Sequence, residues 1–340
     1  MPARSRRLGV TPILIVALLA MLAGCTNAGA TASPSVAPTP TAAATPSATP
    51  ESTPVAAFPV TVTDDEGTPV ELPAEPKKIV SLTPATTEIL FELGAGDRIV
   101  ASDDGSDYPE AAKALVHVAS FDKVDVEKVV ALEPDLVIAG GLGFTPADSI
   151  TKLRSLKLPV VVVYAKSVDG VYADIDLLGT ATGTADAAKT LTTAMRTDMQ
   201  AVSAAVSAGG TKPRVYYEIG YDDTTGAIYA PADQSFVAEM VTLAGADAIT
   251  TGDPASYQIP LETLIQRDPQ IIVLGTNPFY NPTPESVLKR TGWSAMTAVK
   301  NKDVRRVNDI EITRPGPRLP TGLRSLAAAI WPDLTLPPAP

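Results

Sequence analysis

The chain has 340 residues, of which 45% are hydrophobic and 19% are charged, so it can form one large or two ordinary domains with sizeable cores. It contains 27 lysine and arginine residues and 38 aspartate and glutamate residues, which give a formal net charge of -11. This negative charge argues against a nucleic-acid partner. The one cysteine and one histidine exclude a disulfide framework, a Cys/His zinc site and a histidine-rich site for a bare transition metal. A metal carried inside an organic chelate is still compatible with this composition.

Residues 1–24 are predicted to be a lipoprotein signal peptide that is absent from the mature protein. Three arginines among the first seven residues precede the apolar stretch ILIVALLAM at 13–21, which is too short to span a bilayer comfortably. The stretch ends in LAGC at 22–25, which resembles the lipobox of bacterial lipoproteins. We therefore expect a lipidated Cys25 on the outer face of the cell membrane. An uncleaved signal anchor is the alternative, and the export route, secretory or twin-arginine, stays open.

Residues 25–59 are predicted to be a disordered tether. From residue 26 onwards this segment is rich in threonine, alanine, serine and proline, and Glu51 is its only charged residue. Such a composition cannot bury a core and favours an extended, partly polyproline II chain. The folded part is therefore expected to work away from the membrane surface.

An α/β lobe is predicted over residues 60–183. Alternating residues on either side of the turn DDEG at 64–67 indicate a β-hairpin. Short aliphatic runs then alternate with helical patterns, which is typical of a parallel sheet covered on both faces. The expected strands are 60–62, 70–72, 79–82, 136–139 and 160–163, and the expected helices are 86–93, 126–132, 147–156 and 168–178.

A long connecting helix is predicted over 184–210. Apolar residues recur at spacings of three and four along it, and Gly209-Gly210 ends the pattern. About 24 helical residues would reach roughly 36 Å, which is long enough to bridge two lobes. Because bending a packed helix costs more than rotating loop dihedrals, we expect a small closure of the lobes. The apolar stripe consists of Leu191, Met195, Met199, Val202 and Val206.

A second α/β lobe is predicted over residues 211–340, where the alternation of strands and helices starts again. Strands are expected at 215–217, 271–274 and 304–307, and helices at 234–243 and 319–330.

An internal repeat relates the two lobes. VEKVVALEPDLVIAG at 126–140 aligns without gaps on LETLIQRDPQIIVLG at 261–275, and the alignment pairs Glu127 with Glu262. Both segments are typical of a helix, a proline turn and a buried strand. Two such lobes leave a cleft between the carboxyl ends of their strands, where open α/β sheets bind ligands.

Five stretches of the chain carry a family resemblance. They are the region from VTVTDD to GDRIV at 60–100, DYPEA at 107–111, VEKVVALEPDLVIA at 126–139, GWSAMTAVKNKDVRRV at 292–307 and TRPGPRL at 313–319. In this order they resemble the helical-backbone substrate-binding proteins of ABC importers, which deliver cobalamin, ferric siderophores or haem. The resemblance implies two Rossmann-like lobes joined by a single long helix, with the ligand cleft between them. It also implies a monomeric binding protein, not an enzyme, with an ABC permease and its ATPase as partners.

The resemblance implies that Glu127 and Glu262 dock the protein onto its permease. In this family, an acidic residue on each lobe contacts arginines of the permease dimer, and these positions match the two glutamates. Each glutamate opens a predicted helix, and a two-fold partner requires two equivalent contacts. The alternative is a first-turn glutamate that only stabilises its own helix through the helix dipole.

The ligand is expected to contact loops that follow the strands. Aromatic faces and an arginine suit a large chelate of mixed polarity, such as cobalamin or a siderophore. The resemblance places Phe121 and Arg314 at pocket positions of cobalamin-binding relatives. Other aromatic pocket positions of those relatives hold Gly105, Gly140 and Ser256 here, and packing is the alternative for each aromatic residue. The full set of candidates is Phe121, Gly141, Phe144, Tyr221, Tyr257, Phe279, Tyr280 and Arg314.

Other functions stay open at this point. Haem recognition usually uses a tyrosine or histidine ligand to iron; Tyr221 could serve, whereas His117 lies in a predicted strand. A nucleotide-binding enzyme is suggested only by GLG at 141–143, which lacks the third glycine of the motif. A sensor ectodomain with the same fold is the stronger rival. The prediction is a binding protein that needs no cofactor or resident metal of its own.

Overall fold

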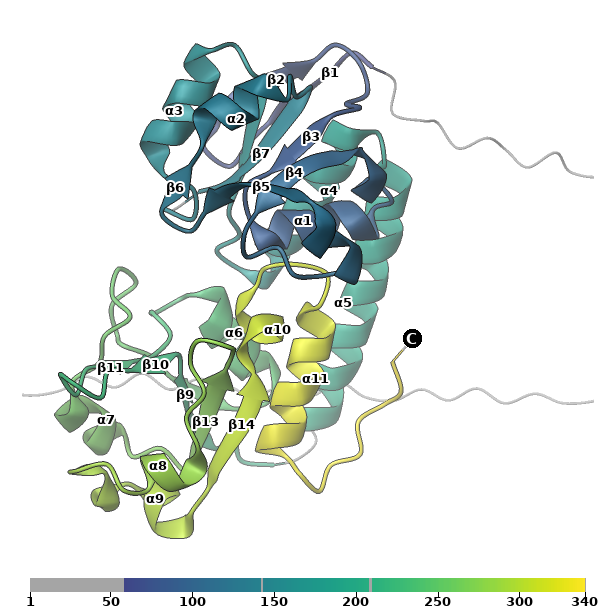
Figure 1. Cartoon of the computed structure of the whole chain (residues 1–340). Coiled ribbons are helices and arrows are strands. Elements are labelled where there is room, and N and C mark those ends of the chain that lie inside the picture. Colours follow the sequence, from purple (N-terminus) through teal and green to yellow (C-terminus); the bar gives the residue numbers. More distant parts are fainter. Residues whose placement is uncertain (1–57, 142, 208–209, 340) are drawn as a thin grey trace, which may run out of the picture. The chain divides into compact units, whose positions relative to one another are not determined.

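The structure is a computed structural model that describes residues 58–141, 143–207 and 210–339. The predicted signal peptide, Cys25 and almost all of the predicted tether therefore lie outside the described residues. The described residues belong to one compact unit, in which two α/β lobes are joined by the helix α5 (Ala185–Ser207) (Figure 1). Among the helices of this part of the chain, none is long and apolar enough to span a membrane.

The first lobe is built on a six-stranded sheet with the order β6-β5-β4-β3-β7-β8. Neighbouring strands are parallel, except that β6 runs antiparallel to β5. Strands β3, β7 and β8 are buried along their whole length, because helices cover both faces of a parallel sheet. The strands are β3 (Ile79–Ser81), β4 (Ile99–Asp103), β5 (Val116–Ser120), β6 (Lys123–Val124), β7 (Leu136–Gly140) and β8 (Val160–Val163).

The predicted hairpin precedes this sheet. Its strands β1 (Val60–Thr63) and β2 (Pro69–Leu72) pair antiparallel, with Val62 opposite Val70. The apolar residues of the hairpin belong to the same core as helix α4, so this hairpin is part of the first lobe. The helices of the lobe are α1 (Pro84–Glu92), α2 (Val126–Ala131), α3 (Ala147–Ser155) and α4 (Val168–Thr182), with 3-10 turns η1 (Gly96–Arg98) and η2 (Glu110–Ala114).

Helices α4 and α5 form an antiparallel pair connected by a tight turn. Gly183 ends α4 in the left-handed conformation (φ 75°), which costs glycine nothing sterically. The helices approach closely at Gly179, where an added Cβ atom would lie 2.4 Å from the Cβ of Ala188. The predicted apolar stripe of α5 is buried, apart from the half-buried Leu191.

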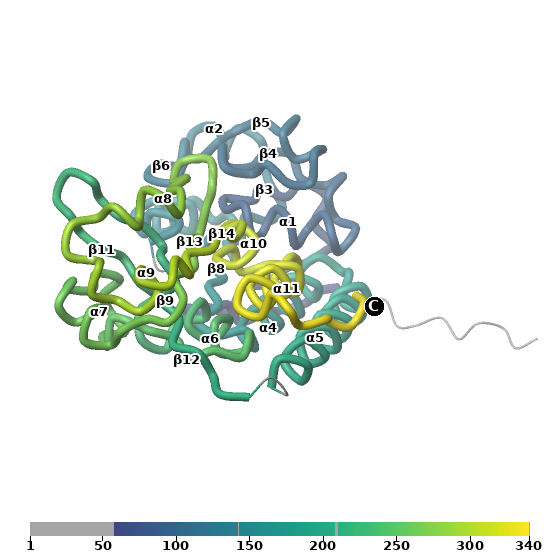
Figure 2. Tube along the Cα trace, turned by 90° about the horizontal axis from the view of Figure 1, so that it is seen from below, coloured from purple at the N-terminus to yellow at the C-terminus, as the bar shows by residue number. Residues whose placement is uncertain are grey.

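The second lobe contains a four-stranded, fully parallel sheet with the order β12-β9-β13-β14. Helix α11 packs against α5, so that α4, α5 and α11 lie together on one side of the molecule (Figure 2). The strands are β9 (Arg214–Glu218), β12 (Asp247–Ile249), β13 (Ile271–Thr276) and β14 (Val304–Asn308), and the hairpin is β10 (Gly220–Tyr221) with β11 (Ile228–Tyr229). The helices are α6 (Phe236–Leu243), α7 (Leu261–Arg267), α8 (Pro284–Val287), α9 (Thr297–Asn301), α10 (Asp309–Thr313) and α11 (Leu319–Ile330), with the 3-10 turn η3 (Trp293–Ala295).

The internal repeat is present in the structure. Helix α2 with strand β7 in the first lobe corresponds to α7 with β13 in the second. The match extends to the backbone, because Glu133 (φ 51°) and Asp268 (φ 44°) occupy equivalent positions in the left-handed region. Each is followed by a proline, which cannot continue a helix.

One hydrophobic core continues from the first lobe into the second. The cluster that contains Leu90 and Ile138 also contains Met199 of α5 and Val241 and Leu323 of the second lobe. The two lobes are therefore joined by packed side chains as well as by the chain itself.

Candidate functional site

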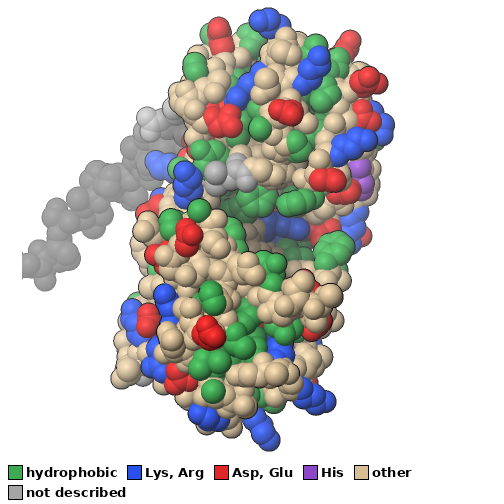
Figure 3. Space-filling view, turned by 90° about the vertical axis from the view of Figure 1, so that its left-hand side faces the viewer, with side chains coloured by type: hydrophobic (Ala, Val, Ile, Leu, Met, Phe, Trp, Pro, Cys, Tyr) green, Lys and Arg blue, Asp and Glu red, His purple; other side chains and the backbone are tan. Residues whose placement is uncertain are grey.

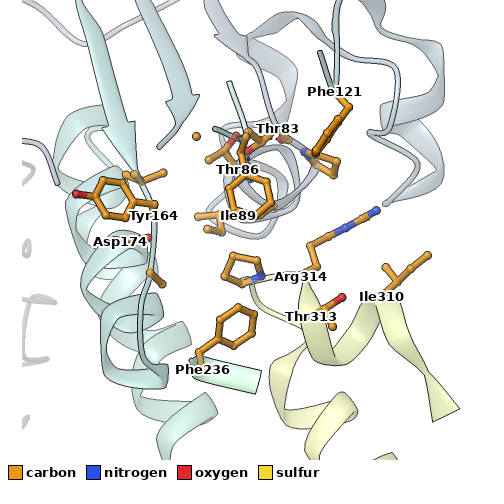
Figure 4. A pocket seen from close by; sticks show the side chains of 17 residues that line it. Thr83, Thr86, Ile89, Phe121, Tyr164, Asp174, Phe236, Ile310, Thr313 and Arg314 are labelled. Carbon is orange, nitrogen blue, oxygen red and sulfur yellow. Dashed lines mark hydrogen bonds between the residues drawn. The ribbon is translucent and has the colours of Figure 1, made fainter. Parts of the chain in front are cut away.

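A cavity of about 290 Å³ lies between the two lobes. Figure 3 shows it as a hollow with hydrophobic side chains around it and basic side chains in its depth. The first lobe contributes α1, α4 and the loops after β5, β7 and β8, and the second contributes α6, α10 and the segment after α10. The lining is Thr83, Pro84, Ala85, Thr86, Ile89, Phe121, Gly140, Phe144, Val163, Tyr164, Ala165, Asp174, Phe236, Ile310, Thr313, Arg314 and Pro315 (Figure 4).

Three of the predicted ligand residues line this cavity: Phe121, Phe144 and Arg314. Phe121 is 77% exposed and Phe144 is 54% exposed, so both offer an uncovered aromatic surface. Gly141 lies outside the lining, since it packs behind Tyr164; an added Cβ atom would lie 2.0 Å from the Cδ1 atom of that ring. The structure thus brings together aromatic loop residues of the first lobe and one arginine of the second.

The four predicted tyrosine and phenylalanine contacts of the second lobe lie outside the cavity lining. Tyr257 and Phe279 are exposed on loops. The guanidinium of Arg290 lies 3.8 Å from the centroid of the Tyr221 ring. The hydroxyl of Tyr280 donates a hydrogen bond to Glu218 at 2.6 Å. Ligand contact through these residues stays a prediction. His117 lies in β5, exposed and outside the lining.

Arg314 bridges the lobes through ion pairs. Its Nη1 atom donates to Oε1 of Glu88 at 2.6 Å and to Oδ1 of Asp107 at 2.9 Å. Arg318 donates to both oxygens of Glu88 as well, at 2.9 and 2.7 Å. Glu88 is almost fully buried in α1, so a carboxylate of the first lobe is held between two arginines of the second. We call Glu88, Asp107, Arg314 and Arg318 the inter-lobe ion cluster.

A chain of hydroxyl groups lies behind one wall of the cavity. Thr83 and Thr86, which line the cavity, are joined by a hydrogen bond of 2.9 Å between their hydroxyls, and Thr86 is bonded in turn to Ser81 at 2.7 Å. Thr87 is bonded to Ser81 at 2.8 Å and to Ser106 at 2.8 Å, and Ser106 is bonded to Asp103 at 2.5 Å; burial raises the pKa of that carboxyl. This wall is polar, yet its hydroxyls bond to one another.

Asp174 on α4 is the acidic residue of the lining, and the sequence pattern did not identify it. It is 5% exposed, and burial raises its pKa to about 8, with the charge of Asp65 acting in the same direction. Nothing in the spacing of α4 distinguishes it from Asp169 or Asp176 on the same helix. Only the packing of the folded lobe shows that it reaches the cavity.

The two predicted docking residues lie in the first turns of α2 and α7. Glu127 and Glu262 are both exposed, and neither forms an ion pair with another described residue. The helix-dipole alternative is compatible with the same position, so docking stays a prediction.

Comparison with known proteins gives consistent matches. The model of the periplasmic binding protein family matches residues 79–310. An uncharacterised ABC transporter substrate-binding lipoprotein of Bacillus subtilis is 32% identical over 332 residues, which cover 96% of this chain and 98% of that protein. A cobalamin-binding protein of Halobacterium salinarum is 31% identical over 290 residues, or 80% of this chain and 74% of that protein. The crystal structure of the periplasmic vitamin B12-binding protein of Vibrio cholerae has a TM-score of 0.64 and 25% identity, and covers 75% of this chain and 96% of that one.

Proposed function

The chain belongs to the periplasmic binding protein family and is a substrate-binding protein of an ABC importer, and we propose that its substrate is a metal chelate, cobalamin or a ferric siderophore. The observation that carries this proposal is the cavity between the lobes, with Phe121 and Phe144 exposed beside it. The cavity is at the small end of the range for ligand pockets, so a large chelate would extend out of it over these two rings.

The relatives confirm the predicted family, the two-lobed fold and the assignment to binding proteins instead of enzymes. The relative from Halobacterium salinarum is named a cobalamin-binding protein, and the structure from Vibrio cholerae is named a vitamin B12-binding protein. These names support cobalamin as the first candidate for this chain.

Haem is the alternative substrate, and the cavity favours it less. Among the described lining residues, Tyr164 is the only tyrosine or histidine that could ligate iron. Its hydroxyl already donates to the backbone oxygen of Asp65 at 3.1 Å.

The direct test of the proposed substrate is an absorbance titration of the purified protein with cobalamin, haem and several ferric siderophores. Saturable binding of haem alone would contradict the proposed substrate.

We also propose that Glu127 and Glu262 dock the protein onto the permease. The internal repeat supports this, since it gives each lobe an exposed glutamate at the same point of the same helix–strand unit. Each interfacial glutamate–arginine pair would contribute about 1.5 to 3 kcal/mol as a charge-assisted contact.

Transport in reconstituted vesicles tests the docking proposal. We expect Glu127→Ala and Glu262→Ala each to impair uptake and the double variant nearly to abolish it, with ligand affinity intact in all three. The neighbouring exposed glutamate Glu133, which lies at the end of α2 and not at its start, provides the control Glu133→Ala. Normal transport by the double variant would refute docking, and so would a loss of ligand binding. A sensor ectodomain would support no uptake even as wild type.

Finally, we propose that Cys25 carries the lipid anchor. Cys25→Ser should move the protein from the detergent phase to the aqueous phase in phase partitioning while its folding stays unchanged. Equal retention of the variant in membranes would instead indicate an uncleaved signal anchor.

A further inference from the structure

Asp174 places a carboxyl group in a cavity wall that is otherwise mostly apolar. It projects from α4 beside Tyr164 and lies on the opposite side of the cavity from Arg314 (Figure 4). With 5% of its surface exposed, it has lost nearly all of its hydration. Burying a carboxyl group is unfavourable unless it is hydrogen-bonded or paired with a cation.

The charged group that acts on Asp174 is another acid, Asp65. Asp65 lies in the turn between β1 and β2, and its charge raises the pKa of Asp174 in the same direction as burial does. Oδ2 of Asp65 also accepts a hydrogen bond from the backbone N–H of Tyr164 at 2.6 Å. No described side chain or backbone group donates a hydrogen bond to Asp174, so its carboxyl can accept one from a group in the cavity.

No described cation neutralises this pair. The salt bridges among the described residues include neither Asp174 nor Asp65, and Asp65 is the only charged residue that acts on the pKa of Asp174. The surrounding charged groups have other contacts or face solvent. They are Asp169 (paired with Arg196), Asp176 (accepting from Thr192), the exposed Lys166 (near the Tyr164 ring), Glu239 (accepting from the backbone N–H of Val168), and Glu88 with Asp107 (paired with Arg314).

We propose that Asp174 recognises the substrate by accepting a hydrogen bond from an N–H donor on the periphery of the chelate. This inference rests on the proposed function and narrows its substrate class. An amide group gives Asp174 the donor that the protein does not supply. A peripheral carboxylate would add a third acid to the pair and would be repelled. The cavity therefore selects a chelate whose periphery carries amides over one that carries carboxylates at this position.

Substrate binding is then coupled to the release of a proton. Because burial raises the pKa of Asp174 to about 8, the empty pair holds a proton at neutral pH. A donor on the substrate favours the ionised carboxylate, so the proton passes to the buffer when the complex forms. Affinity should rise with pH up to the pKa of the empty protein, by at most tenfold per pH unit.

The experiment compares wild type, Asp174→Asn and the control Asp176→Asn, which changes an exposed acid of the same helix. The probes are cobalamin and a cobalamin derivative whose peripheral amides have been hydrolysed to carboxylates. Dissociation constants are measured by absorbance at pH 6, 7 and 8. Calorimetry in two buffers of different ionisation enthalpy gives the number of protons released.

For wild type and Asp176→Asn, we expect at least tenfold preference for the amide form, tighter binding at pH 8 than at pH 6, and release of up to one proton per ligand. For Asp174→Asn, we expect the proton release and the pH dependence to disappear and the preference to shrink several-fold. Asparagine keeps the size of the side chain and one acceptor, so cobalamin should still bind.

Three outcomes overturn the inference in different ways. If cobalamin binds and Asp174→Asn keeps the wild-type pH dependence and amide preference, Asp174 does not recognise the substrate, although the proposed function stands. If neither corrinoid nor any ferric siderophore binds to the wild type, or if only haem binds, the proposed function fails and the inference fails with it. A lower thermal midpoint of Asp174→Asn with unchanged proton release would assign Asp174 to the fold and also overturn the inference.

Discussion

Arg314 has two roles that single substitutions can separate. It lines the cavity, and it also belongs to the inter-lobe ion cluster, where it contacts Glu88 and Asp107. Arg318 shares the contact with Glu88 but does not line the cavity. The two arginines therefore form a matched pair.

Arg314→Ala should weaken chelate binding by about 1 to 3 kcal/mol if the guanidinium makes a charge-assisted contact with the substrate. Arg318→Ala should weaken it much less, because it removes only a contact between the lobes. Dissociation constants from absorbance titration measure both. Equal losses in the two variants would mean that the ion cluster, not a direct contact, supports binding.

The buried carboxyl of Asp174 also makes stability depend on pH. Its pKa is about 8 in the folded protein against an ordinary value of 3.8, so between these values the folded chain keeps a proton that the unfolded chain has lost. Raising the pH through this window therefore favours unfolding. Asp174→Asn should be more stable than wild type by on the order of 2 kcal/mol at pH 8, and the difference should shrink towards pH 4. Urea unfolding at pH 4.5, 6 and 8 measures it, and a constant difference would contradict the raised pKa.

Position in the chain predicts which loop residues reach the cavity, while their contact with a ligand stays a prediction. Phe121, Phe144 and Arg314 follow strands or a short helix near a strand end, so the order of elements leads them to the cleft. Asp174 and Phe236 instead reach the cavity from helices. Which face of a helix meets a cavity depends on how two lobes pack, and the local pattern does not contain that information.

Elements were predicted best where the apolar pattern is long or has clear ends. The bounds of β8 and α11 agree with those expected, and α5 was predicted to within a few residues. Strands β4 and β12 and the short helix α10 were not predicted. Strand β4 ends in the buried polar pair Ser102 and Asp103, and β12 and α10 have three and five residues, too few to show a period.

The contact between α4 and α5 depends on the absence of a side chain at Gly179. Because an added Cβ atom would lie 2.4 Å from Ala188, Gly179→Val must push the two helices apart. We expect a loss of about 1 to 3 kcal/mol in the free energy of unfolding, measured by urea denaturation. Gly67→Val is the control, since its site is open and only its backbone conformation is strained. A smaller loss at Gly179 than at Gly67 would show that the helices can separate freely.

On the scale of the whole molecule, three connections fix the position of one lobe relative to the other. They are the helix α5, the hydrophobic core that continues between the lobes, and the inter-lobe ion cluster around Glu88. A wide opening would have to expose packed side chains and separate a buried carboxylate from two arginines, which is costly. The small closure expected from the sequence is consistent with this arrangement.

These connections have a consequence for the speed of substrate capture. If the cavity exists before the substrate arrives, association is a single encounter with no slow rearrangement, and relatives that differ in affinity would differ mainly in how long the complex lasts. In stopped-flow mixing, the observed rate should rise linearly with chelate concentration and show no plateau. A plateau would reveal a rate-limiting opening of the lobes. Repeating the measurement with Glu88→Gln would then show whether breaking the buried charge cluster sets that opening rate.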